Sequence, residues 1–157
     1  MIKQYNKNKI IPFNRFGFTL LEIITVLAIM GIVMTISIPV YRQIQPNIEL
    51  SATARQITTD LRQAQQLAVT EQVIYSVEFN IVDSSYEIIN TDSEQVFKQE
   101  TISANIKINS ITDLTDDTVS FNATGAALES GTITLTNRKN ASSTIEIKPS
   151  GYVRISQ

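Results

Sequence analysis

One apolar run near the N-terminus constrains this chain more than any other feature. Residues 18–40 read FTLLEIITVLAIMGIVMTISIPV; 16 of these 23 residues are apolar, and Glu22 is the only charge. A helix from Phe18 to Ile38 would be about 31 Å long, which matches the roughly 30 Å hydrocarbon core of a bilayer. The run therefore predicts one membrane-spanning helix.

The charges on either side of this run predict its orientation. Residues 1–17 contain four Lys or Arg residues and no acidic residue, whereas only Arg42 follows closely behind the run. Basic residues on the N-terminal side favour a cytoplasmic N-terminus. The remaining chain has nine Lys and Arg against fifteen Asp and Glu. We therefore expect an acidic, well-solvated domain outside the cytoplasm.

The composition excludes most catalytic chemistry. The chain contains no Cys and no His, so disulfide frameworks, thiol catalysis, Ser-His-Asp triads and Cys- or His-based metal sites are excluded. Asp113, Asp116 and Asp117 are close in sequence but lack the spacing and the glycine of an EF-hand, and we expect an acidic surface loop there. The sequence predicts neither an enzyme nor a cofactor or metal site.

The segment after the apolar run predicts a second helical stretch. Pro39 should kink a continuing helix or end it, and Pro46 repeats the signal. From Glu49 onward, apolar residues recur at spacings of three and four: Leu50, Ala54, Ile57, Leu61, Ala64 and Ala68. The opposite side carries polar residues, among them Arg55 and Asp60. We expect the apolar stripe to pack on the sheet of its own domain.

From residue 73 the apolar period becomes two, which is typical of strands. Strand candidates are 73–81, 86–91, 96–99, 105–108, 118–122, 131–137, 143–148 and 152–156. The predicted fold is α+β, with a long N-terminal helix packed on a small, mostly antiparallel sheet. Its parts are a basic leader (1–17), a transmembrane helix (18–40), an amphipathic continuation (41–72) and a β-rich head (73–157).

Gly17 separates the basic leader from the apolar helix, so a cut after it would keep the whole helix. Glu22 would cost about 2.5–3.5 kcal/mol inside a bilayer if it had no partner. The cut would create an amine on Phe18, four residues from Glu22 and on the same helical face. That amine could neutralise Glu22 within one chain or between neighbouring chains. Alternatively, Glu22 lies near enough to the interface to reach water.

The stretch from Gly17 to Glu22, followed by a long apolar helix, resembles the class III signal of type IV prepilins and type II secretion pseudopilins. The resemblance implies cleavage after Gly17 by a prepilin peptidase, methylation of the Phe18 amine, and Glu22 as the assembly carboxylate. Gly31 and Pro39 resemble positions that weaken pilin stalks and allow bending. In a helix, Gly costs about 1 kcal/mol and Pro about 3 kcal/mol relative to Ala.

Residues 52–80 and 119–155 resemble minor pseudopilins of the GspH/FimT type. The resemblance implies a type IV pilin-like fold and a minor subunit at the tip or initiation complex of a type II secretion pseudopilus or type IV pilus. Its partners would be other pilins, an inner-membrane assembly platform and membrane lipid. The subunit would be stored in the cytoplasmic membrane and then occupy a filament in the periplasm or at the cell surface.

An alternative function is DNA binding on a natural-transformation pilus. Some relatives have a Gly-Arg-x-Arg motif where this chain has Gly151-Tyr152-Val153-Arg154. Residues 129–157 carry four cations against two acids, a local charge of +2. These cations are Arg138, Lys139, Lys148 and Arg154. So few cations support only weak, salt-sensitive contact with DNA, and the favoured interpretation is a solvated strand edge whose charges oppose self-aggregation.

Overall fold

The computed structural model describes residues 17–156, so the leader lies outside the described residues except for Gly17. The first element, α1, is a 52-residue helix, Leu20–Glu71. It passes through Pro39 and Pro46 without ending, so of the two outcomes predicted for Pro39, termination does not occur. A proline removes one helical hydrogen bond, and the bonds of the flanking turns keep the helix continuous.

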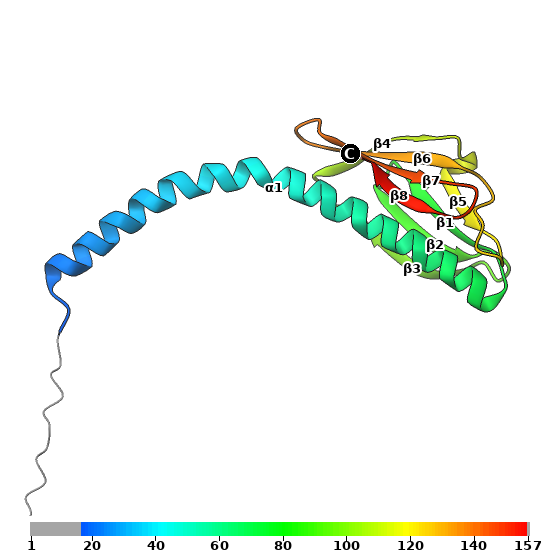
Figure 1. The fold of residues 1–157 in the computed structure, drawn as a ribbon, viewed down its shortest axis with the longest axis horizontal. Helices are drawn as coiled ribbons and strands as arrows, with labels where there is room; N and C mark the ends of the chain where they lie inside the picture. Colours follow the sequence, from blue (N-terminus) through cyan, green and yellow to red (C-terminus); the bar gives the residue numbers. More distant parts are fainter. Residues whose placement is uncertain (1–16, 157) are drawn as a thin grey trace, which may run out of the picture. The chain divides into compact units, whose positions relative to one another are not determined.

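Within residues 17–156, eight strands follow α1, with one short 3₁₀ turn before the fifth (Figure 1). They are β1 Tyr75–Asn80, β2 Ser85–Asn90, β3 Gln95–Thr101, β4 Ile106–Thr112, η1 Thr115–Asp117 (the 3₁₀ turn), β5 Thr118–Phe121, β6 Gly131–Asn137, β7 Ser142–Ile147 and β8 Val153–Ser156. The predicted strands agree with these bounds to within two residues, except that β4 continues four residues further.

The strands form two four-stranded sheets, in the orders β3-β2-β1-β5 and β4-β6-β7-β8, and every pair is antiparallel. The sequence pattern predicts one sheet, whereas the structure has two. The division arises between β3 and β4, which are consecutive in the chain but do not pair. Instead β4 pairs with β6, from Ile106 opposite Asn137 to Thr112 opposite Thr132. Periodicity along a strand does not encode its pairing partner, because both sheets bury alternate residues.

The chain divides into two compact units, Met1–Val40 and Tyr41–Gln157. In the described part of the first unit, residues 17–40, every residue is exposed and all the regular structure belongs to α1. The second unit is the head, which contains the rest of α1 and both sheets.

The core of the head lies between α1 and the two sheets. The apolar stripe predicted on the helix is confirmed, because all six of its residues are buried: Leu50, Ala54, Ile57, Leu61, Ala64 and Ala68. They form one cluster with residues of both sheets, including Val77, Phe121, Ile133 and Ile145. Full burial of a large aliphatic or aromatic side chain contributes about 1.5–3 kcal/mol. The three small alanines allow the helix backbone to approach the sheets closely.

Asp60 departs from the prediction. The helical pattern assigned it to the polar side of α1, but its residue is only 3% exposed. It lies three residues after Ile57 and four before Ala64, which places it at the edge of the buried stripe. An ionisable residue is buried in this way only when it has partners, and the head supplies them.

Candidate functional site

The helix begins at the residues of the class III motif. Thr19 is the N-cap of α1: its Oγ1 accepts a hydrogen bond from the amide of Glu22 at 3.2 Å, and its carbonyl accepts from the amide of Ile23 at 3.2 Å. Thr at the N-cap with Glu three residues later is the residue pattern of a capping box. The residues after Gly17 therefore also determine where the helix starts.

Glu22 lies in the first turn of α1 and is exposed. The partial positive charge at a helix N-terminus favours a carboxylate at this place. Phe18 precedes the cap, outside the helix. In the uncleaved chain the two residues therefore do not share a helical face, and their placement on one face after cleavage stays a prediction. Neutralisation of Glu22 by an amine of a neighbouring chain does not require Phe18 and Glu22 of one chain to share a helical face.

Gly31 and Pro39 lie within the exposed part of α1. The Thr35 hydroxyl donates to the Gly31 carbonyl at 2.8 Å. A Cβ at Gly31 would meet no atom within 4 Å among the described residues, so contacts within this chain do not require glycine there. Pro39 has no amide proton, so the carbonyl of Thr35 loses its usual helical donor.

A buried polar cluster joins α1 to β2 and to the edge strand β3 of the first sheet. Asp60 Oδ2 accepts from the Tyr86 hydroxyl at 2.5 Å, and the Lys98 ammonium donates to Asp60 Oδ1 and Oδ2 at 2.9 and 3.0 Å. Burial, and then the hydrogen bond to Asp60, raise the pKa of Tyr86. The hydrogen bond to Asp60 raises the pKa of Lys98, and Glu100, 3.2 Å away, adds to this.

Further contacts hold α1 against the loops of the head. The Glu49 carboxylate accepts from Ser103 and from the Asn105 amide, and these hydrogen bonds lower the pKa of Glu49. Gln65 Nε2 donates to the Gly125 carbonyl at 2.6 Å. Gly151 has a φ of +79°, and a Cβ there would lie 2.0 Å from the Gly125 carbonyl oxygen. The segment after β5 and the β7–β8 turn therefore meet at a point where only glycine fits.

The four cations proposed for DNA contact do not form one patch. Arg138 and Lys139 lie in the turn before β7, whereas Lys148 lies in the turn after it. Arg154 pairs with Glu146 at 2.5 Å, and Lys148 lies 4.0 Å from the same carboxylate. The second group lies at the far end of β7, where Arg154 on β8 is opposite Glu146, and Glu146 offsets its charge.

The three aspartates considered as calcium ligands are not arranged as a metal site. Asp113 precedes η1, and Asp116 and Asp117 belong to it. Among residues 17–156, no group of three or more Asp, Glu, His or Cys side chains is arranged to hold a metal ion.

A long N-terminal helix packed on antiparallel sheets, with an apolar first half that begins directly after the Gly17-Phe18 junction, defines a type IV pilin-like subunit. By length and composition, α1 could cross a membrane. The family model described as type II transport protein GspH matches residues 53–151, and a model of the prokaryotic N-terminal methylation motif matches residues 12–38. The chain belongs to the GspH family.

Solved structures have the same fold. The minor pilin FimU of Pseudomonas aeruginosa is 14% identical, with a TM-score of 0.58, over 71% of this chain and 90% of FimU. The minor pseudopilin EpsH of the Vibrio cholerae type II secretion system is 11% identical, with a TM-score of 0.58, over 69% of this chain and 96% of EpsH. A comparison with curated proteins gives no match. The predicted fold class and family resemblance are confirmed.

Proposed function

We propose that this chain is a minor subunit of a type II secretion pseudopilus or type IV pilus, incorporated at the tip or initiation complex. Membership of the GspH family carries this proposal. Subunits of this family are structural, and we infer that this one acts by assembling with other pilins rather than by catalysis. No observation favours the DNA-binding alternative, because the four cations expected to contact DNA are divided between the two ends of β7 and Arg154 is paired with Glu146.

The exposed part of α1 supports storage in a membrane before assembly. Every residue from Gly17 to Gln45 is exposed, including Leu20, Leu27 and Ile36, which are each more than half exposed. Such an apolar surface needs lipid or other helices around it. We infer a single span in the cytoplasmic membrane with the N-terminus inside, followed by transfer through an assembly platform into a bundle of pilin helices. The filament then carries the head into the periplasm or to the cell surface.

We propose that a prepilin peptidase cuts between Gly17 and Phe18 and that the new Phe18 amine is methylated. The methylation-motif match over residues 12–38 supports this proposal. Mass spectrometry of the chain isolated from cells with an active peptidase should show a product that begins at N-methylated Phe18. A product that still contains Met1 through Gly17 in those cells would contradict the proposal.

We propose that Glu22 acts in assembly by pairing with the Phe18 amine of a neighbouring subunit. Glu22→Val should insert into the membrane normally but enter sheared filaments much less than the native chain. Thr19→Ala is the matched control, because it removes the cap hydrogen bond and leaves the carboxylate in place. Normal incorporation of Glu22→Val, or an equal loss with Thr19→Ala, would contradict a role for the charge itself.

A further inference from the structure

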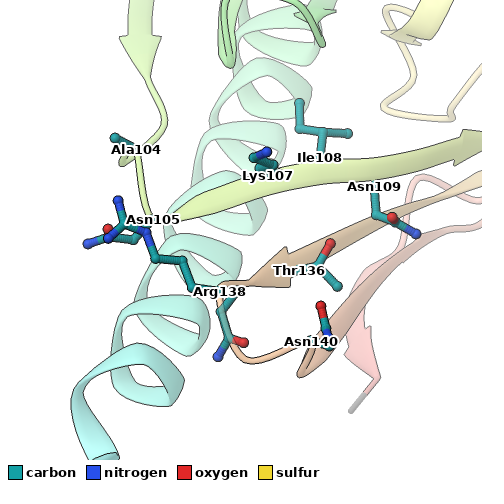
Figure 2. Close-up of a pocket in the computed structure, with 9 residues that line it drawn as sticks. Ala104, Asn105, Lys107, Ile108, Asn109, Thr136, Arg138 and Asn140 are labelled. Atoms are coloured by element: carbon teal, nitrogen blue, oxygen red, sulfur yellow. The ribbon is translucent and has the colours of Figure 1, made fainter. Parts of the chain in front are cut away.

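A polar pocket of about 590 Å³ opens at one end of the head, between the start of β4 and the turn that joins β6 to β7. Figure 2 shows Lys107 and Asn109 on β4 and Thr136 and Arg138 at the end of β6. Asparagine amides and two cations dominate its lining. Its residues are Ala104, Asn105, Lys107, Ile108, Asn109, Thr136, Asn137, Arg138 and Asn140.

The rim of this pocket is bonded to the first residues of the head. The Lys139 ammonium donates to the Gln43 carbonyl at 2.9 Å, and Asn137 Nδ2 donates to Asn47 Oδ1 at 2.9 Å. Gln43 is the third residue after Val40, the last residue of the predicted span. At 1.5 Å per helical residue, it lies only about 4.5 Å further along the helix. The headgroup layer on each side of a bilayer is about 5–8 Å thick, so the pocket belongs to the membrane-proximal end of the head.

Positive charge gathers at this end although the head as a whole is acidic. Residues 41–157 contain nine Lys and Arg and fourteen Asp and Glu, a net charge of −5. We define the basic pole as Arg42, Lys107, Arg138 and Lys139. In the part of the chain that the structure describes, none of these four forms an ion pair, whereas Lys98, Lys148 and Arg154 do. Glu49, which also binds Ser103 and Asn105, is the carboxylate close to Arg138.

We propose that the basic pole binds the phosphate groups of anionic phospholipids at the surface of the membrane from which α1 emerges. The proposal rests on the membrane storage inferred above. Phosphate oxygens accept hydrogen bonds from guanidinium, ammonium and amide groups, which are the groups around this pocket. Cations near an anionic surface act within a Debye length of about 8–10 Å. The contact holds the head against the bilayer during storage and is released when the subunit is extracted into the filament.

The test uses the full chain, reconstituted in vesicles of phosphatidylcholine alone or mixed with phosphatidylglycerol. The chain has no Cys, so Ser142→Cys places a single fluorophore beside the basic pole, at the first residue of β7, and Ser150→Cys places one in the turn at the other end of β7. Energy transfer to a lipid-bound acceptor should rise with phosphatidylglycerol at residue 142 and return to the phosphatidylcholine value at high salt, and it should stay unchanged at residue 150.

The variant that tests the pole is the triple change Lys107→Gln, Arg138→Gln and Lys139→Gln. A cation near an anionic surface contributes about 1 kcal/mol, or about fivefold, so the ratio of docked to free heads should fall about a hundredfold. Lys148→Gln with Arg154→Gln is the control, because it removes charge at the other end of β7 and should leave docking unchanged. Thermal unfolding of each variant shows that the head remains folded.

The possible failures are distinguishable. If the chain inserts normally but energy transfer is equal in both lipids, the lipid-binding proposal is wrong and the proposed membrane storage still stands. The same conclusion follows if Lys148→Gln with Arg154→Gln reduces docking as much as the triple change does. Displacement by inorganic phosphate but not by chloride at the same ionic strength would show a site for free phosphate instead. Cross-linking of residue 142 to a second subunit in both lipids would show a protein interface. A chain that inserts into neither vesicle would overturn the proposed membrane storage as well.

Discussion

The Tyr86 hydroxyl on β2 donates a 2.5 Å hydrogen bond to the Asp60 carboxylate on α1, and both residues are buried. The Lys98 ammonium on β3 binds the same carboxylate. This cluster links the helix to β2 and to the edge strand β3, which is otherwise largely exposed. It therefore specifies how the helix lies on that sheet.

Removing either partner of the Tyr86–Asp60 bond should destabilise the head. Tyr86→Phe removes a hydrogen bond to a charged group and should cost about 1.5–3 kcal/mol. Asp60→Ala should cost about 3 kcal/mol or more, because it leaves a buried hydroxyl and a partly buried ammonium without their partner. Urea unfolding measures both. Gln99→Ala is a suitable control, because the bond from Gln99 to Glu87 is exposed and its loss should change stability by less than about 0.5 kcal/mol.

The same cluster predicts a loss of stability at alkaline pH. The folded-state pKa values of Tyr86 and Lys98 are raised above the unfolded values of about 10 and 10.4. Below about pH 10 the stabilising contribution of these two groups is fully present. Above that pH the unfolded chain releases protons that the folded chain retains, so the free energy of unfolding falls as pH rises. Melting temperatures between pH 8 and pH 11 should show this fall. It should be smaller in Tyr86→Phe but unchanged in Tyr152→Phe, whose side chain is exposed.

Gly151→Ala should strongly destabilise the head. The new Cβ would lie 2.0 Å from the Gly125 carbonyl oxygen, which is backbone and cannot rotate away, and the φ of +79° adds strain. The expected cost is about 3 kcal/mol or more. Thermal unfolding measures this cost. Ser150→Ala, at an exposed position in the same turn, should have little effect, and an equal loss there would contradict the steric explanation.

Gly31→Ala separates the stability of α1 from its proposed bending. A Cβ at Gly31 meets no described atom, so alanine should increase helix stability by about 1 kcal/mol. If bending at Gly31 is needed, the variant should nevertheless enter filaments less well, as measured in sheared fractions. Ala28→Gly is the matched control, because it adds flexibility one turn earlier. Normal incorporation of Gly31→Ala would show that bending there is not required.

The local pattern was sufficient for most elements of the fold. The period of two in β6, where alternate residues from Gly131 to Asn137 are buried, and the spacing of Leu50, Ala54 and Ile57 follow directly from strand and helix geometry. The motif from Gly17 to Glu22 could also be recognised from the sequence, because the hydrogen bond between Thr19 and Glu22 at the start of α1 is local. Such features depend on neighbours within four residues along the chain.

What the sequence determined by itself is the helix, the strands and the exposed apolar segment, because their periods are local. Only the tertiary structure decided that β4 pairs with β6 rather than with β3 and that Asp60 is buried against Tyr86 and Lys98. It also decided that Lys107 and Arg138 line one pocket and that Lys139 is bonded to Gln43. These relationships join residues up to 96 positions apart. They depend on which surfaces pack together, and the periodicity of one segment carries no information about its partner.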